Sequence, residues 1–413
     1  MRILLIHQAF CGPQDPGGTR HYELAHRLAC LGHRFTVVTS KYSYLTGAEK
    51  AALPNRDEVD VRLAPVIGSW HRSYVRRVLA FLSFSITAVF TALQAERADV
   101  VIGTSPPIFQ ALSAWIVAAV RRRPFILEIR DLWPDFAVDL GVLRSGVLIS
   151  LARKLEFFLY ARAKEIIVNS PSYRNYLLEK GIPESKIVVI PNGVDVSLFC
   201  LEETGEDFRR DHELHGKFVV MYAGAFGLAN DIDCLLKMAA RLRHQPDVVL
   251  ALVGDGKELP RLWREANSLQ LSNVRFIAAQ SKQQMPRVLA AADVCVATLK
   301  DVPTLRTTFP NKVFDYMAAG RPTVLAIDGA IREVIDKSQG GISVNPGDDA
   351  ALAEAILALY RSPELRREMG TNARSYVGLH FDRSLQANQV ARILQRSRDL
   401  SPVKDTDIAV SGS

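Results

Sequence analysis

The chain has 413 residues, is 48% hydrophobic and carries a formal net charge of +7. This length accommodates two ordinary domains, and the hydrophobic content excludes a wholly disordered chain. The first 195 residues hold 24 Lys and Arg against 17 Asp and Glu, whereas the remainder is neutral. An excess of positive charge in one half indicates a surface that meets an anionic partner. No zinc-finger, RNA-recognition or helix-turn-helix signature accompanies this charge, so we expect no nucleic-acid partner.

The five cysteines are scattered, odd in number and without Cys-x-x-Cys spacing. Neither a disulfide framework nor a zinc site is therefore predicted, and a reducing cytoplasm fits best. The N-terminal apolar run is about one strand long and turn residues follow at once, so we expect no signal peptide.

Short β-branched runs alternate with longer helical stretches along the whole chain, which predicts parallel sheets with helices on both faces. The strands expected in the first half are residues 2–7, 35–39, 100–103, 125–128, 165–169 and 186–190. Those expected in the second half are residues 218–222, 248–253, 274–277, 294–297, 323–326 and 342–344. Two series of this length predict an α/β chain with two doubly wound, Rossmann-like domains that face a cleft.

The join between the domains is expected at residues 191–195, where Pro and Asn-Gly favour a turn. We expect an N-terminal domain over residues 1–192, a C-terminal domain over 193–375, a helix over 376–397 that crosses back to the first domain, and a disordered tail over 398–413. Because ligands bind outside the carboxyl ends of strands in such sheets, the loops there are where chemistry is expected.

Two loops of the first half hold candidate residues. Gly17, Gly18 and Thr19 precede a helix that starts near Arg20, a pattern typical either of backbone contact with a phosphate or acceptor or of a long turn and helix start. Charged residues crowd the end of a later apolar strand, where they must be paired or face a ligand. They are Glu128, Arg130, Asp131 and Asp135, and Thr104 ends a preceding strand.

The second half has glycine-containing loops after its first two strands. These loops place backbone groups that could contact a nucleotide at Gly224, Phe226, Gly227, Gly254, Asp255 and Gly256. Asp231 and Asp233 have Asp-x-Asp spacing, but acidic residues in the first turn of a helix are the ordinary capping pattern, so no metal site is expected. No G-x-G-x-x-G or Walker A motif is present.

The most informative segment runs from Thr308 to Pro322. Pro310 is suited to a helix start, so the amides from Asn311 to Phe314, that of Val313 included, would face a bound anion, with Lys312 adding a positive charge. Asp315 lies one turn further on and could accept hydrogen bonds from a ribose. The segment therefore predicts a cradle for a nucleotide diphosphate without a metal.

Taken in order, several motifs resemble glycosyltransferase family 4, whose members are retaining enzymes of the GT-B fold. They are MRILLIHQAF and GGTRHYELAHRLACLGH at the start, LEIRDLWPD, IVNSPSY and IPNGVD in the middle, and YAGAFG, LVGDG and FPNKVFDYMAAGRPTV in the second half. The sequence is similar to the L-fucosamine transferases of bacterial O-antigen synthesis in particular. The resemblance covers nearly the whole chain and implies a donor-binding second domain and an acceptor-binding first domain.

The resemblance also shows where this chain departs from the family. Two family glutamates eight residues apart correspond to Thr307 and Asp315, so one carboxylate is lost and the other is shortened. The family's Arg and Lys for the pyrophosphate are missing from YAGAFGLAND, which leaves Lys312 and the helix amides with that role. A family histidine is replaced by Asp131. We therefore expect Asp131, Arg130 and Lys312 to be catalytic, with Arg20, Glu128 and Thr104 facing the sugar.

An apolar segment of about 16 residues, 78–93, follows Arg72, Arg76 and Arg77. It is short for a transmembrane helix and matches an interfacial helix with a basic flank, in which Phe81 and Phe84 would face the membrane. Residues 147–164 are a second candidate. A buried core helix remains the alternative for both.

The predicted function is retaining, metal-independent transfer of a sugar from a nucleotide-diphosphate sugar, expected to be UDP-linked, to a lipid-linked saccharide in surface polysaccharide synthesis. The acceptor would carry a polyprenyl diphosphate, and the enzyme would act at the cytoplasmic face of the inner membrane without a cofactor. A non-catalytic nucleotide-sugar-binding or scaffold subunit and a nucleotide-sugar 2-epimerase are the alternatives. Donor sugar, acceptor, linkage and oligomeric state cannot be derived from the sequence.

Overall fold

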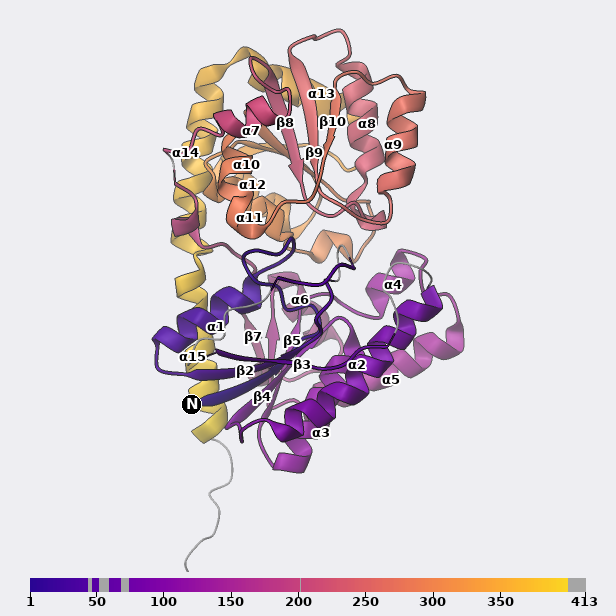
Figure 1. Ribbon diagram of the computed structural model, residues 1–413, viewed down its shortest axis with the longest axis vertical. Helices are drawn as coiled ribbons and strands as arrows, with labels where there is room; N and C mark the ends of the chain where they lie inside the picture. Colours follow the sequence, from indigo (N-terminus) through magenta and orange to yellow (C-terminus); the bar gives the residue numbers. More distant parts are fainter. Residues whose placement is uncertain (44–46, 52–58, 68–73, 201, 400–413) are drawn as a thin grey trace, which may run out of the picture.

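A computed structural model describes residues 1–43, 47–51, 59–67, 74–200 and 202–399. Two units, each a parallel sheet between helices, are stacked along the long axis of the molecule (Figure 1). Within these residues, no helix is long and apolar enough to cross a membrane.

The N-terminal unit is built on a seven-stranded parallel sheet. In spatial order its strands are β3 (Val59–Leu63), β2 (Arg34–Thr39), β1 (Arg2–Ile6), β4 (Val100–Ser105), β5 (Phe125–Ile129), β6 (Glu165–Val168) and β7 (Ile187–Val189). The helices that follow these strands are α1 (Arg20–Cys30), α2 (Tyr74–Gln94), α3 (Ile108–Arg121), α4 (Asp135–Asp139), α5 (Gly146–Arg162) and α6 (Pro171–Glu179). Alternate residues of β1 supply two cores, because successive side chains point to opposite faces. Leu4 and Ile6 pack with α2, α3, α5 and α6, whereas Ile3 and Leu5 pack with α1.

The C-terminal unit is built on a six-stranded parallel sheet. In spatial order its strands are β10 (Val274–Ile277), β9 (Val248–Val253), β8 (Phe218–Ala223), β11 (Val294–Thr298), β12 (Thr323–Ala326) and β13 (Gly341–Ser343). Its helices are α7 (Glu206–Asp211), α8 (Ile232–Arg241), α9 (Leu259–Ser268), α10 (Met285–Ala290), α11 (Asn311–Ala318), α12 (Ala330–Ser338), α13 (Asp349–Arg361) and α14 (Pro363–His380). Both faces of this sheet are covered by apolar cores, as parallel strands require.

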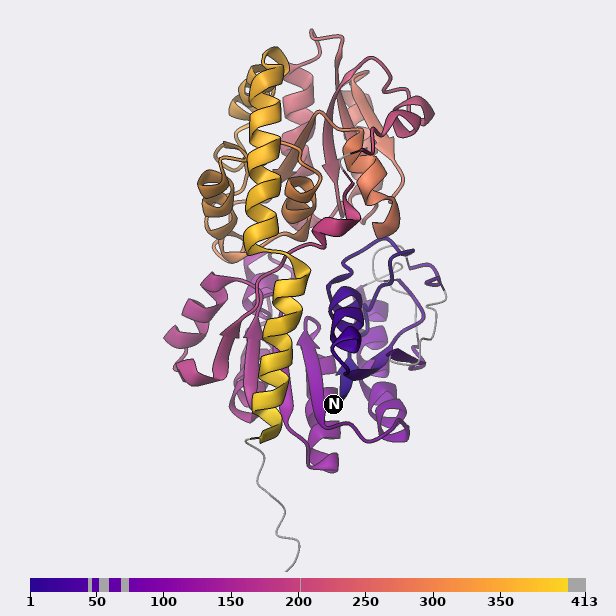
Figure 2. The same cartoon turned by 90° about the vertical axis from the view of Figure 1, so that its left-hand side faces the viewer.

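The last helix, α15 (Arg383–Asp399), covers the second face of the N-terminal sheet beside α1 (Figure 2). The helix expected over residues 376–397 is instead shared between the end of α14 and α15, which are separated by Phe381 and Asp382. The crossing helix begins at Arg383, and residues 400–413 of the expected tail lie outside the described residues.

Candidate functional site

Loops that follow strands of the first sheet meet loops that follow strands of the second. Their hydrogen bonds are Gln283 N to Pro13 O (2.8 Å), Thr304 N to Asp139 Oδ2 (3.1 Å) and Asn192 Nδ2 to Phe309 O (2.7 Å). The carboxyl ends of the two sheets therefore face each other across the domain boundary, which is where ligands bind in open parallel sheets.

Lys312 lies in the first turn of α11, which begins directly after Pro310. Its ammonium donates to the Tyr222 hydroxyl (2.5 Å) and to Asn230 Oδ1 (2.8 Å), and within the described part of the chain no carboxylate pairs with it. Burial lowers the pKa of Lys312 to about 7. This cation lacks the counter-charge that a bound diphosphate would supply.

The α11 N-terminus carries no side-chain cap, so its first amides are available to an anion. Asn311 is exposed there, next to Lys312. Val313 is fully buried and its amide donates to Pro310 O (3.1 Å), so this amide is already satisfied within the protein.

The loops after β8 and β9 are in direct backbone contact. A Cβ atom at Gly254 would lie 1.9 Å from Gly224 O, and one at Gly256 would lie 2.4 Å from Phe226 O, so glycine is required at both positions. The Phe226 ring is fully buried, so this residue could contact a ligand only through its backbone. The Asp255 carboxylate accepts from Gly256 N (2.7 Å), and Gly227 leads into the turn that carries Asn230.

Asp315, expected to hold a ribose, is paired in the structure. Its carboxylate accepts a hydrogen bond from Lys282 Nζ at 2.5 Å, and both side chains are mostly buried. Burial raises the pKa of Asp315, an effect that the Lys282 cation opposes. A ribose bound by Asp315 would have to share or replace this lysine.

Arg130 and Asp131 follow β5 in the N-terminal domain. Arg130 is held by hydrogen bonds from Nε to Thr104 Oγ1 (2.7 Å) and from Nη2 to Pro106 O (2.7 Å). The Asp131 carboxylate makes no hydrogen bond or ion pair within the described residues, and burial raises its pKa to about 6 despite the neighbouring Arg130. An unpaired carboxylate with a raised pKa is a candidate proton acceptor or sugar ligand.

Tyr173 lies between Asp131 and the second domain. Burial and the charge of Asp131 raise the pKa of its hydroxyl, an effect that Thr307 of the second domain opposes, and Ser170 Oγ at the start of the same helix donates to Thr307 O (2.5 Å). Asp131 also lines a small cavity of about 10 Å³ together with Glu156 and Tyr160. The carboxylate is therefore positioned between the interior of the first domain and the domain boundary.

The expectation that Arg20, Glu128 and Thr104 face the sugar is wrong. Arg20 Nε donates to Glu128 Oε1 (3.0 Å), and the same arginine donates to the carbonyls of Ile190 and Pro191. Both side chains are buried, and Thr104 is fully buried under Arg130. A buried ion pair of this kind holds α1 against the strand ends, because an unpaired charge there would be costly.

Gly17 and Gly18 are exposed at the domain boundary, whereas Thr19 is buried and donates to Glu23 Oε1 (2.5 Å). A Cβ at Gly18 would lie 3.9 Å from Asn311 Nδ2, so this loop contacts the start of α11. Of the expected acceptor-side residues, Gly17 and Gly18 therefore remain at the site, whereas the Thr19 side chain faces the protein.

The residues expected to face a membrane have different positions. Arg72 lies outside the described residues, and Arg76 and Arg77 lie in the first turn of α2. Phe81 is partly buried. Phe84 is fully buried in the core, so its assignment to the membrane face is wrong, because it lies on the side of α2 that packs against the sheet.

Several functional candidates were missed by sequence reasoning. Tyr222 and Asn230 hold Lys312, Lys282 pairs with Asp315, and Tyr173 reaches the domain boundary. Tyr222 and Asn230 lie in the YAGAFGLAND segment already singled out, so polar residues there were an available signal. No sequence signal points to Lys282, because its partner is 33 residues away. Among the residues that the structure describes, no group of three His, Cys, Asp or Glu could hold a metal ion.

Two family models match the chain. The Glycosyl transferase 4-like domain matches residues 17–193, and Glycosyl transferases group 1 matches residues 217–362. Together the two matches leave out only residues 1–16, 194–216 and 363–413. The chain belongs to glycosyltransferase family 4.

This family 4 glycosyltransferase has relatives among known proteins. It is 25% identical over 406 residues to the putative colanic acid biosynthesis glycosyl transferase WcaI of Escherichia coli K12, which covers 94% of this chain and 98% of the relative. It is 26% identical over 280 residues to the probable glycosyltransferase WbjE of Pseudomonas aeruginosa, 67% of this chain and 69% of the relative. The solved structure of Anabaena HepE in complex with UDP-glucose has a TM-score of 0.74 at 20% identity, over 96% of this chain and all of that one. The expected GT-B fold of two doubly wound domains is confirmed.

Proposed function

We propose that the protein transfers a sugar from a nucleotide-diphosphate sugar, UDP-linked, to a lipid-linked saccharide in bacterial surface polysaccharide synthesis. Transfer proceeds with retention and without a metal, and the protein works at the cytoplasmic face of the membrane. The solved structure of HepE with UDP-glucose and the name of WcaI, which refers to colanic acid biosynthesis, support the donor class and the pathway type.

The observation that carries this proposal is the uncompensated Lys312. A buried ammonium held by two neutral groups at an uncapped helix start is suited to a diphosphate, which is the leaving group of such a donor. When that group is bound, its charge stabilises the protonated lysine. Lys312 and the α11 amides then stabilise the charge that develops on the leaving diphosphate.

The other residues position the reacting groups. Asp315 holds the ribose with help from Lys282, and Gly224, Gly254 and Gly256 let the backbone approach the nucleotide. In front-face transfer the donor's own phosphate oxygen helps to remove the acceptor proton, so the protein contributes mainly orientation. Asp131 accepts a hydrogen bond from a sugar hydroxyl near the domain boundary.

The membrane-associated part of the proposal is supported by α2. Leu79, Leu82, Ile86, Phe90 and Leu93 are exposed at helical spacing along one face of this helix. An exposed apolar stripe on a helix whose first turn carries Arg76 and Arg77 is typical of an interfacial helix.

The experiment is incubation with a panel of nucleotide sugars and a polyprenyl-diphosphate-linked saccharide, with the product's mass and anomeric configuration determined. We expect a product with retained anomeric configuration, formed without added metal.

Asp131→Asn should lower kcat with little change in donor affinity. Asp315→Asn should weaken donor binding by about 1–3 kcal/mol, the usual loss for buried hydrogen bonds. Asp207→Asn, on exposed α7, is the matched control and should change neither.

Other outcomes separate the alternatives. Donor binding without product would contradict the enzyme proposal and support a binding or scaffold subunit. Conversion of the nucleotide sugar into its 2-epimer would support an epimerase. An inverted product would contradict retention.

A further inference from the structure

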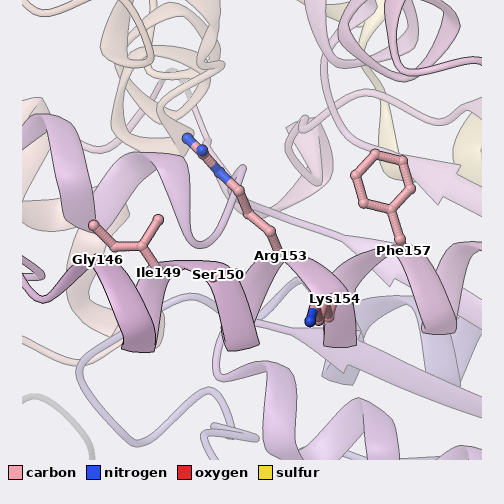
Figure 3. A pocket seen from close by; sticks show the side chains of 6 residues that line it. All are labelled: Gly146, Ile149, Ser150, Arg153, Lys154 and Phe157. Atoms are coloured by element: carbon pink, nitrogen blue, oxygen red, sulfur yellow. The ribbon is translucent and has the colours of Figure 1, made fainter.

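The face of α5 that borders α4 forms an open groove with a volume of about 610 Å³. Six residues of this one helix line it: Gly146, Ile149, Ser150, Arg153, Lys154 and Phe157. Gly146, Ser150 and Lys154 form one row at four-residue spacing, and Ile149, Arg153 and Phe157 form a second row beside it. Figure 3 shows the side chains of Ile149, Arg153 and Phe157 projecting to the same side of α5.

The groove combines a hydrocarbon surface with positive charge. Gly146 and Ser150 are small and leave a hollow between larger neighbours, and Phe157 and the adjacent Val147 and Leu151 are exposed. The Lys154 ammonium has no hydrogen bond or ion pair within the described residues.

The balance of charge on the groove helix is positive. By sequence α5 carries Arg153, Lys154 and Arg162 against Glu156, while the bordering α4 carries Asp135, which pairs with Arg153, and Asp139, which accepts from Thr304 N. Glu156 is only 1% exposed, so it does not offset the positive charge at the surface. A surface that is both apolar and basic is complementary to an anionic lipid.

The groove is also connected to the transfer site. Arg153 Nη2 pairs with Asp135 Oδ1 of α4 at 3.0 Å, and Asp139 at the other end of α4 accepts from Thr304 N of the donor-binding domain. One short helix therefore separates the α5 groove from the domain boundary where the sugar would be transferred.

We propose that the α5 groove binds the isoprenoid diphosphate of the lipid-linked acceptor. This inference rests on the proposed function, because it identifies the part of the acceptor that this surface holds. Lys154 pairs with the diphosphate, and the exposed apolar residues of α5 contact the first isoprene units before the chain enters the bilayer. The saccharide then extends past α4 to the domain boundary.

A second copy of the chain fits this surface less well. A symmetric dimer through α5 would place Lys154 of each copy beside the cations of the other without an exposed acidic partner on the helix. An anionic lipid removes that repulsion and covers the apolar side chains at the same time.

The test measures binding of farnesyl diphosphate to the full chain, with inorganic diphosphate and farnesol as the two half-ligands. Gly146→Leu fills the groove, and no atom lies within 4 Å of the added Cβ, so the fold should tolerate it. Gly378→Leu on α14 is the matched control, because its Cβ also meets nothing within 4 Å. Lys154→Glu reverses the charge, with Arg367→Glu on α14 as its control.

Wild type should bind farnesyl diphosphate more tightly than either half-ligand. Gly146→Leu and Lys154→Glu should each weaken that binding at least about tenfold, the factor that corresponds to loss of one charged contact. The two controls should bind like wild type, and UDP binding should be unchanged in all variants. The proposal would be overturned if the wild-type protein does not bind farnesyl diphosphate, or if the groove variants bind it as tightly as the wild type does.

Two further outcomes are informative. A wild-type dimer that Gly146→Leu dissociates would make the groove an interface between copies, which overturns the lipid assignment. Failure of the proposed function would show in a different measurement, as a protein that does not bind nucleotide sugars at the Lys312 site.

Discussion

At the scale of single residues, a charge's partner decides what that charge can do. Arg20 and Glu128 pair with each other in the interior, so their charges are used within the protein. Lys312 is held by a tyrosine hydroxyl and an amide oxygen, so its charge remains available to a ligand. All three are polar residues near strand ends or helix starts in the sequence, and only their partners distinguish them.

The lowered pKa of Lys312 predicts a pH dependence. Affinity for UDP should weaken as pH rises through about 7, because the free protein loses the cation. Lys312→Met should weaken UDP binding by about 1.5–3 kcal/mol at low pH and flatten the pH profile. Titration of UDP into both proteins between pH 6 and 9 tests this, and a pH profile that survives the substitution would contradict it.

The same group affects stability with a definite sign. Between the folded pKa of about 7 and the ordinary value of 10.5, the unfolded chain binds more protons than the folded one. The contribution of Lys312 to the free energy of unfolding therefore rises with pH across that window, and Lys312→Met should remove this rise.

At the scale of elements, α2 shows why composition alone cannot orient a helix. Phe84, Ala88 and Ala92 are fully buried and belong to the core that packs on the sheet, whereas Ile86 and Phe90 are exposed although they are equally apolar. A helix that is apolar on all sides has no periodic signal that separates the two faces. Tertiary packing alone shows which side remains uncovered.

The exposed face of α2 predicts binding to anionic vesicles that falls with salt. Ile86→Glu with Phe90→Glu should reduce this binding strongly, since both side chains lie on the uncovered face. Replacing Arg72, Arg76 and Arg77 with Ala should also reduce it. Leu379→Glu on α14 is the control for an exposed apolar residue elsewhere. Vesicle co-sedimentation gives the readout, and binding insensitive to both sets of changes would exclude α2 as the membrane face.

At the scale of the whole molecule, the two domains are joined where α14 ends and α15 begins. Arg383 donates to Glu23 of α1 (2.7 Å) and to the Gly193 carbonyl (2.6 Å). The chain passes between the two domains twice, near Gly193 and at the start of α15, and Arg383 holds both passages against α1. Val194 forms a parallel bridge with Asp382 at the same place. This region sets the position of the C-terminal domain relative to α1.

Breaking this buried pair should destabilise the protein. Arg383→Met leaves Glu23 buried without its partner and should cost about 3–5 kcal/mol in the free energy of unfolding. Lys337→Met, which removes an exposed pair on α12, should change stability little. Denaturant unfolding followed by tryptophan fluorescence provides the comparison, and equal effects of the two substitutions would contradict the structural role of Arg383.

Glu23, the partner of Arg383, makes the stability of the protein depend on pH in the acid range. Burial alone would raise its pKa, but Arg383 and Lys282 outweigh burial and hold the pKa at about 2, below the ordinary 4.5. The stability that this carboxylate contributes is complete above about pH 4.5 and is lost as pH falls toward 2. Glu23→Gln should remove this part of the acid sensitivity.

The sequence by itself determined the α/β class, the two series of parallel strands and the segments that hold Lys312, Asp315 and Asp131. These features are local, because strand runs and helix starts depend on neighbours along the chain. One strand escaped prediction: β3 (Val59–Leu63) is a short edge strand whose apolar residues alternate with Asp60 and Arg62. Tertiary structure decided that Lys282 meets Asp315, that Arg20 and Glu128 are internal, and that Phe84 is buried while Ile86 is exposed. Such pairings join positions far apart in the chain or choose between equally apolar faces, and only packing of the folded elements determines them.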